Sequence, residues 1–160
     1  MFDHHPFNLG DERAIQAMWE SDKIPLVNGF LFCTAQLFHV PPNLDNCQRS
    51  FSPWSEEPLP VFIKREGVQY VDLGKRTDSL NLDKLRIVFG EGSRGSDGFV
   101  AVTSNTDFVY WIFFHQNLNP IERVRVDDGV IHAFSTSGYE VCLPLYHPYN
   151  GRVVRATQHS

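Results

Sequence analysis

The sequence predicts an α+β fold, made mainly of an antiparallel β-sheet, a meander of about six to eight strands, with one N-terminal helix packed on it. Residues 108–114 form an unbroken apolar and aromatic run with turn-forming residues at both ends, which is typical of a central strand covered on both faces. Short turn-forming segments separate the apolar runs around it, and such connections require antiparallel neighbours. Only one stretch, near the N-terminus, has clear helical spacing.

That helix is expected over residues 11–20. Acidic residues occupy its first turn, and Ile15, Met18 and Trp19 fall on one face. Pro25 lies beyond its end. Residues 29–40 are also apolar, and their content of Phe and β-branched residues favours one long strand.

The remaining strands are expected from short apolar runs. A hairpin is predicted from residues 61–63 and 68–73, with Gly67 at a position that needs a positive φ. The further strands are expected at residues 85–89, 98–102, 124–126, 130–134 and 139–145.

A chain of 160 residues is close to the usual size of one domain, and we expect a single domain over residues 1–160. A long loop is expected at residues 41–60, which contain five prolines. Trp54 and Phe51 either form a contact surface there or fold back and hold the loop on the core. We expect a short edge strand and a frayed tail at about residues 152–160.

The charge and the cysteines restrict the classes of partner and compartment. A net charge of −5 argues against nucleic acid as a ligand, because phosphate binding needs clustered Lys and Arg. Three cysteines without a CxxC pair indicate reduced thiols and hence a cytoplasmic protein. The start of the sequence has no signal-peptide pattern and no run reaches the roughly 18 apolar residues of a membrane span, so no membrane association is expected.

Residues 90–95 match the GxGxxG pattern directly after a predicted strand. A dinucleotide site also needs a helix that starts in the glycines, so that its N-terminal amides hold the pyrophosphate. Another strand-forming run follows instead. The glycines therefore predict a hairpin loop and no nucleotide binding.

The sequence shows no pattern of a metal or catalytic site. Potential soft ligands are present but widely and irregularly spaced: Cys33, His39, Cys47, Cys142 and His147. Structural zinc sites usually come from close Cys or His pairs, so no metal and no cofactor are expected. A GxSxG elbow is absent, and Cys142 beside His132 or His115 has no local signature, so no catalytic residue is assigned. Either histidine would titrate near neutral pH if a carboxylate adjoined it.

These observations favour a binding protein over an enzyme. In general character residues 99–145, above all 108–114 with Asn119 and Pro120, resemble the small immunity proteins that bacteria keep in the cytosol to neutralise polymorphic toxins. The resemblance implies a cytoplasmic protein whose acidic surface blocks a toxin, often a basic nuclease. It assigns no site residues to this chain.

We therefore expect an acidic and aromatic surface that binds a basic protein partner, with charge setting the association rate and aromatic anchors the affinity. The candidate contacts are Trp54, Glu56, Glu57, Asp97, Asp127 and Asp128. Two alternatives stay open. One is a small enzyme with a pocket in which His115 or His132 meets a carboxylate. The other is an oligomeric structural or sensor domain in which a second copy completes a sheet edge.

Overall fold

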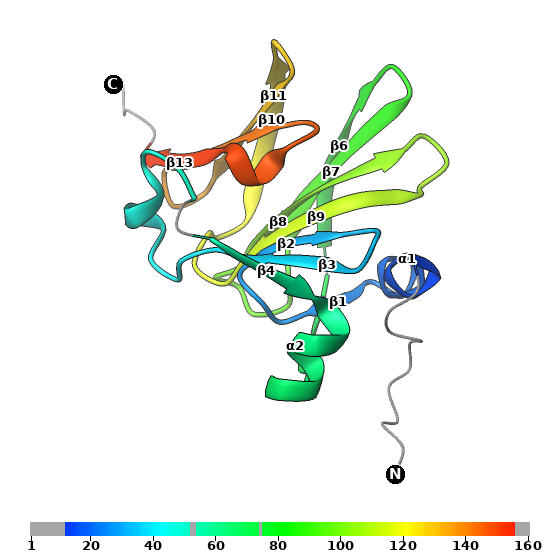
Figure 1. Cartoon of the computed structure of the whole chain (residues 1–160). Coiled ribbons are helices and arrows are strands. Elements are labelled where there is room, and N and C mark those ends of the chain that lie inside the picture. Colours follow the sequence, from blue (N-terminus) through cyan, green and yellow to red (C-terminus); the bar gives the residue numbers. More distant parts are fainter. Residues whose placement is uncertain (1–11, 52–53, 74, 156–160) are drawn as a thin grey trace.

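The computed structural model describes residues 12–51, 54–73 and 75–155, and the strands of these residues form three antiparallel sheets (Figure 1). The mainly antiparallel α+β class is confirmed. The prediction of one meander with one helix is wrong, because these residues contain several sheets and two α-helices. Consecutive strands are joined by short turns as expected, but they form separate sheets, and the two largest sheets pack face to face.

The largest sheet has seven strands in the order β4-β3-β2-β9-β8-β7-β6. Its strands are β2 (Gly29–Phe32), β3 (Gln36–His39), β4 (Ser55–Pro58), β6 (Lys75–Leu82), β7 (Leu85–Glu91), β8 (Gly98–Ser104) and β9 (Val109–His115). As expected from its aromatic run, β9 is the central strand, and it joins an N-terminal hairpin to the β6–β9 meander by pairing with β2.

The second sheet has four strands and covers one face of the first. It consists of β10 (Ile121–Asp127), β11 (Val130–Ser135), β12 (Tyr139–Pro144) and β13 (Arg152–Arg155), each paired with the next. Its inner face and the facing side of the large sheet share one hydrophobic core, in which Phe113 and Trp111 meet Ile131 and Val141. The predicted edge strand near the C-terminus is β13, whereas residues 156–160 of the predicted tail lie outside the described residues.

The opposite face of the large sheet is covered by α1 (Glu12–Glu20), α2 (Leu59–Glu66) and the two-stranded sheet of β1 (Lys23–Pro25) and β5 (Tyr70–Asp72). The predicted buried face of α1 is confirmed, since Ile15, Met18 and Trp19 are fully buried. Trp19 also donates from Nε1 to Asp107 Oδ1 at 3.0 Å, which ties α1 to the turn before β9. No helix among the described residues is long and apolar enough to cross a membrane.

Two predicted strands have a different structure. The predicted strand at residues 61–63 lies instead within the helix α2. Leu59 and Ile63 lie four residues apart on one buried face of this helix, and Pro60 is tolerated in a first helical turn. Gly67 has the expected positive φ, 77°, but it ends α2 and does not turn a hairpin. Residues 29–40 form two strands, because Ala35 adopts a left-handed conformation in a tight turn between them.

The predicted long loop is partly regular and is held on the core. It contains the 3-10 helix η1 (Leu44–Cys47) and the edge strand β4. Phe51 is fully buried, and the Trp54 ring lies 5.1 Å from that of Phe38. Of the two interpretations of these aromatics, the structure supports the one in which they fold back. Residues 90–95 lie in the predicted β7–β8 hairpin.

Candidate functional site

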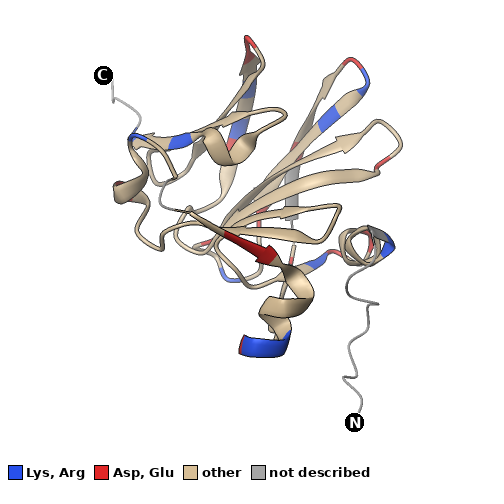
Figure 2. Cartoon of the chain, viewed as in Figure 1, with Lys and Arg blue, Asp and Glu red and all other residues tan. Residues whose placement is uncertain are grey.

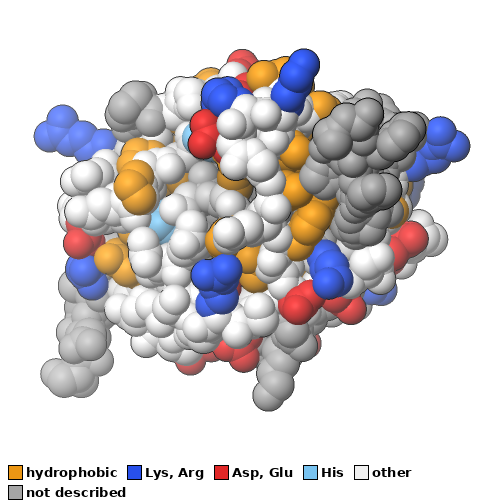
Figure 3. Space-filling view, turned by 90° about the horizontal axis from the view of Figure 1, so that it is seen from below, with side chains coloured by type: hydrophobic (Ala, Val, Ile, Leu, Met, Phe, Trp, Pro, Cys, Tyr) orange, Lys and Arg blue, Asp and Glu red, His pale blue; other side chains and the backbone are white. Residues whose placement is uncertain are grey.

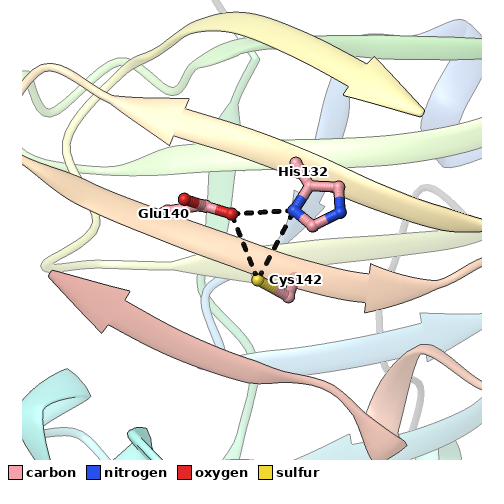
Figure 4. A group of neighbouring side chains, drawn as sticks. All are labelled: His132, Glu140 and Cys142. Carbon is pink, nitrogen blue, oxygen red and sulfur yellow. Dashed lines mark hydrogen bonds and ion pairs between the residues drawn. The ribbon is translucent and has the colours of Figure 1, made fainter. Parts of the chain in front are cut away.

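Three side chains with different chemistry converge on the outer face of the four-stranded sheet (Figure 4). His132 Nδ1 lies 2.7 Å from Glu140 Oε2, and Cys142 Sγ lies 3.7 Å from the same nitrogen. The thiol donates to Glu140 Oε2 at 3.5 Å. We call this group the His-Glu-Cys cluster.

The β11–β12 hairpin explains why these three residues meet. His132 is paired directly with Cys142 across the two strands, and Glu140 lies two residues before Cys142, so all three share one face. The alternate residues Ile131 and Val141 point into the core and are fully buried. Because inward packing fixes the register, the outward residues are held in place as well.

Two arginines continue this row across the sheet. The register pairs Arg125 of β10 with His132, and Cys142 with Arg152 of β13. Burial and the neighbouring charge of Glu140 raise the pKa of the Cys142 thiol to about 11, while Arg152 and Arg125 act in the opposite direction. The thiol is therefore protonated near neutral pH, which argues against Cys142 as the nucleophile of a small enzyme.

A second feature is an exposed pair of aromatic rings at the start of β9. The pairing of β8 with β9 shifts register between Val102 and Thr103, so that Tyr110 is an extra residue in the ladder. Such a bulge turns a side chain out of the normal alternation. Phe108 and Tyr110 are 38% and 39% exposed, and their rings touch edge to face at 5.4 Å. The expectation that all of residues 108–114 would be covered is wrong for these two residues, which we call the aromatic ridge.

A hollow lies on each side of the aromatic ridge. One, of about 440 Å³, is apolar and is lined by Tyr110, Trp111 and Tyr146, of which Tyr146 is 76% exposed. The other, of about 400 Å³, lies between Phe108 and α1 and has Arg13 and Glu20 at its border. Each ring of the ridge therefore lines one depression, Tyr110 the first and Phe108 the second, and the second also has two charged side chains in its lining.

The predicted acidic contacts do not assemble into one surface. Glu56 and Glu57 lie on β4, which is red in Figure 2, but Glu57 is engaged within the protein. Arg65 binds it through two hydrogen bonds, of 2.6 and 2.8 Å, and His39 lies 2.6 Å from its Oε2. Mainly because of Arg65, the pKa of Glu57 falls to about 2.

Asp97 is fully buried, so its prediction as a surface contact is wrong. Its Oδ1 accepts the backbone N–H of Gly92 at 2.9 Å and closes the β7–β8 loop, and its Oδ2 has no hydrogen-bond partner among the described residues. Asp127 and Asp128 are exposed at the β10–β11 turn, on a different sheet from β4. In the face that Figure 3 shows, positive and negative side chains alternate without a block of one sign.

Among the described residues, no carboxylate contacts His115. Its Nδ1 accepts the backbone N–H of Asn117 at 3.1 Å, so Nε2 carries the proton and donates to the Pro41 carbonyl at 3.0 Å. Burial lowers the pKa of His115 from its ordinary 6.5, an effect that the Pro41 hydrogen bond partly opposes. The neutral imidazole joins the loop after β3 to the end of β9, which is a structural role.

This burial predicts a loss of stability in mild acid. Below pH 6.5 the unfolded chain takes up a proton at His115 before the folded protein does, so the free energy of unfolding falls as the pH drops from about 7 to 5. Urea unfolding at a series of pH values measures this slope. We expect a shallower slope for His115→Gln, whose side-chain amide can still donate to Pro41. An equal slope in both proteins would contradict the assignment.

Comparisons with known proteins do not place the chain. No family model matches the sequence, and no match is found among curated proteins or among solved structures. The resemblance to immunity proteins thus rests on the character of the sequence alone.

Proposed function

We propose that this chain is a protein-binding module that contacts its partner through the aromatic ridge, in the manner of an immunity protein that neutralises a toxin. The observation that carries this proposal is the exposure of Phe108 and Tyr110 between two hollows. Aromatic rings that stand out of a rigid strand supply large contact areas with little loss of side-chain entropy on binding. Tyr110 lies near the start of the central strand β9, which is paired with β2 on one side and with β8 on the other.

The surroundings of the ridge resemble the anatomy of a protein interface. Interface centres are rich in Tyr, Trp and Phe, and their borders are polar and charged. Here Tyr110 and Tyr146 border the apolar hollow, while Arg13 and Glu20 border the other one. A partner side chain inserted into each hollow would bury the ridge between them.

The exposed acidic residues have a different proposed role from the aromatic ridge. Glu56 on β4 and the pair Asp127 and Asp128 are distant from the ridge in the chain and do not join it into one patch. With a net charge of −5, they would speed the approach of a basic toxin without forming the contact that holds it. Charge reversal at these positions should therefore change the association rate more than the dissociation rate.

The test is binding of the purified chain to the toxin domain encoded beside it, measured by titration. We expect Tyr110→Ala to raise Kd by about 30-fold, because truncation of a central aromatic anchor typically costs about 2 kcal/mol of binding free energy. The matched control is Val61→Ala on α2, a side chain that is 50% exposed and remote from the ridge in the sequence. Its Kd should stay within about twofold.

Two results would count against the proposal. If no saturable complex forms with the neighbouring toxin, the immunity role is lost. If a complex forms but Tyr110→Ala and Val61→Ala bind equally well, the ridge is not the contact surface. Sedimentation of the chain alone shows whether a second copy occupies the ridge, in which case Tyr110→Ala would dissociate the oligomer.

A further inference from the structure

We propose that His132, Glu140 and Cys142 form a binding site for a zinc-class divalent metal ion on the outer face of the four-stranded sheet. The inference rests on three donor atoms of the types that Zn²⁺ prefers, an imidazole nitrogen, a carboxylate oxygen and a sulfur, within one small group. It is independent of the aromatic ridge, whose residues lie on β9 and the turn before it.

The spacing of the donor atoms fits a tetrahedral ion. With metal distances of about 2.0–2.1 Å to nitrogen and about 2.3 Å to sulfur, a tetrahedron places these two ligands about 3.6 Å apart, and the sulfur and oxygen ligands about the same distance apart. The observed separations from Sγ are 3.7 Å to His132 Nδ1 and 3.5 Å to Glu140 Oε2. Two edges of the coordination tetrahedron are therefore already present.

The third edge has to open by a small amount. His132 Nδ1 and Glu140 Oε2 lie 2.7 Å apart as hydrogen-bond partners, whereas two metal ligands of these types lie about 3.4 Å apart. A rotation of the Glu140 carboxylate is sufficient, because the two residues are on adjacent paired strands whose register does not have to change. Ligands on paired strands are held more precisely than ligands on loops.

The cluster holds protons that a metal ion would replace. The thiol of Cys142 donates its proton to Glu140, and the imidazole and the carboxylate share another. Metal binding needs a thiolate, a bare Nδ1 and a carboxylate. The ion takes the position of these shared protons: the thiol proton is released to solvent, and the imidazole carries its proton on Nε2 and stays neutral. The resulting thiolate and carboxylate balance the charge of a divalent ion.

Three protein ligands leave one coordination position for water or an anion. The side chains of His132 and Glu140 are 19% and 20% exposed, so the cluster is open to solvent. Arg125 and Arg152 flank the cluster in the cross-strand row, and both influence the charge state of Cys142. Their positive charges favour an anionic group, such as a carboxylate or phosphate, as the fourth ligand.

The experiment is calorimetric titration of the metal-free full chain with Zn²⁺, together with Co²⁺ as a spectroscopic probe. We expect one ion per chain, and with Co²⁺ a thiolate-to-metal charge-transfer band and the strong visible absorption of a tetrahedral complex. Cys142→Ser should abolish the charge-transfer band, and His132→Gln should weaken Zn²⁺ binding by at least about 10-fold.

Matched variants separate the proposed site from other ligands. Cys33→Ser removes a thiol on the other sheet system, and His4→Ala/His5→Ala removes the histidine pair near the N-terminus. Both should bind Zn²⁺ like the original chain. Each variant is first unfolded thermally without metal, and a rise in Tm on adding Zn²⁺ should occur in these controls and be absent in Cys142→Ser.

The proposal is overturned if Zn²⁺ binds no more tightly than about 1 mM, or if Cys142→Ser keeps the stoichiometry and the cobalt spectrum of the original chain. Loss of binding in the Cys33 variant or in the double histidine variant, with Cys142→Ser unaffected, overturns it as well. Tyr110→Ala should bind Zn²⁺ normally, so the outcome here is separate from that of the toxin titration.

Discussion

Replacement of Phe113 by alanine is expected to lower the free energy of unfolding by about 3–5 kcal/mol. Phe113 is fully buried at the middle of the central strand. Its ring lies 4.7 Å from that of Phe30 on the neighbouring strand and 5.5 Å from that of Phe51, which holds the loop after η1. The substitution leaves a cavity between the two sheets, and paired strands on both sides of β9 prevent the backbone from closing it.

Urea unfolding at pH 7 measures this loss, and Phe108→Ala is the matched control. The control removes the same ring one residue before the same strand, but at a site that is exposed to solvent. Its unfolding free energy should change by less than about 1 kcal/mol. The packing implies that the core between the sheets depends on Phe113. Similar losses of unfolding free energy in the two variants would contradict this.

Gly29→Ala is expected to destabilise the protein by about 3 kcal/mol or more, from two physical causes that add. Gly29 has a φ of 154°, a value that residues with a Cβ atom rarely adopt. A Cβ at this position would also meet the backbone carbonyl oxygen of Phe38 far inside van der Waals contact. Because β2 is hydrogen-bonded to β3 and β9, neither partner can move away without breaking the sheet.

Gly67→Ala separates these two causes. Gly67 also has a positive φ, 77°, but nothing lies within 4 Å of the position that its Cβ would take. This variant should lose only the conformational part, about 1–3 kcal/mol. Thermal unfolding of the two variants side by side makes the comparison. If Gly29→Ala were no less stable than Gly67→Ala, the close approach of β2 and β3 would make no contribution to the loss of stability.

Part of the His-Glu-Cys cluster could be predicted from the sequence. Glu140 and Cys142 are two residues apart in a predicted strand, so their shared face follows from strand geometry alone. The preceding predicted strand and the short turn between them place His132 opposite Cys142. Cys142 beside His132 is considered as a catalytic pair from the sequence, but Glu140 is not joined to it and no metal is expected, because the three residues meet only across a hairpin.

The aromatic ridge and the buried Asp97 illustrate the opposite case. Nothing in residues 108–114 distinguishes the exposed ring of Tyr110 from the buried ring of Trp111, because the bulge depends on how β8 and β9 align. Asp97 looks like a solvated loop acid, yet a backbone amide of the same loop pulls it inward. Both outcomes depend on partners that local residue patterns do not reveal.

Local sequence patterns were sufficient to predict the buried face of α1, the central position of β9 and the hairpins of the C-terminal half. Helical periodicity, apolar runs and short turns all depend on residues that are close in the sequence. The division into stacked sheets, the helix at residues 59–66 and the pairing of β2 with β9 were decided only by the folded chain. A short apolar run is compatible with either a helix or a strand, and the surface against which it is buried determines which of the two forms.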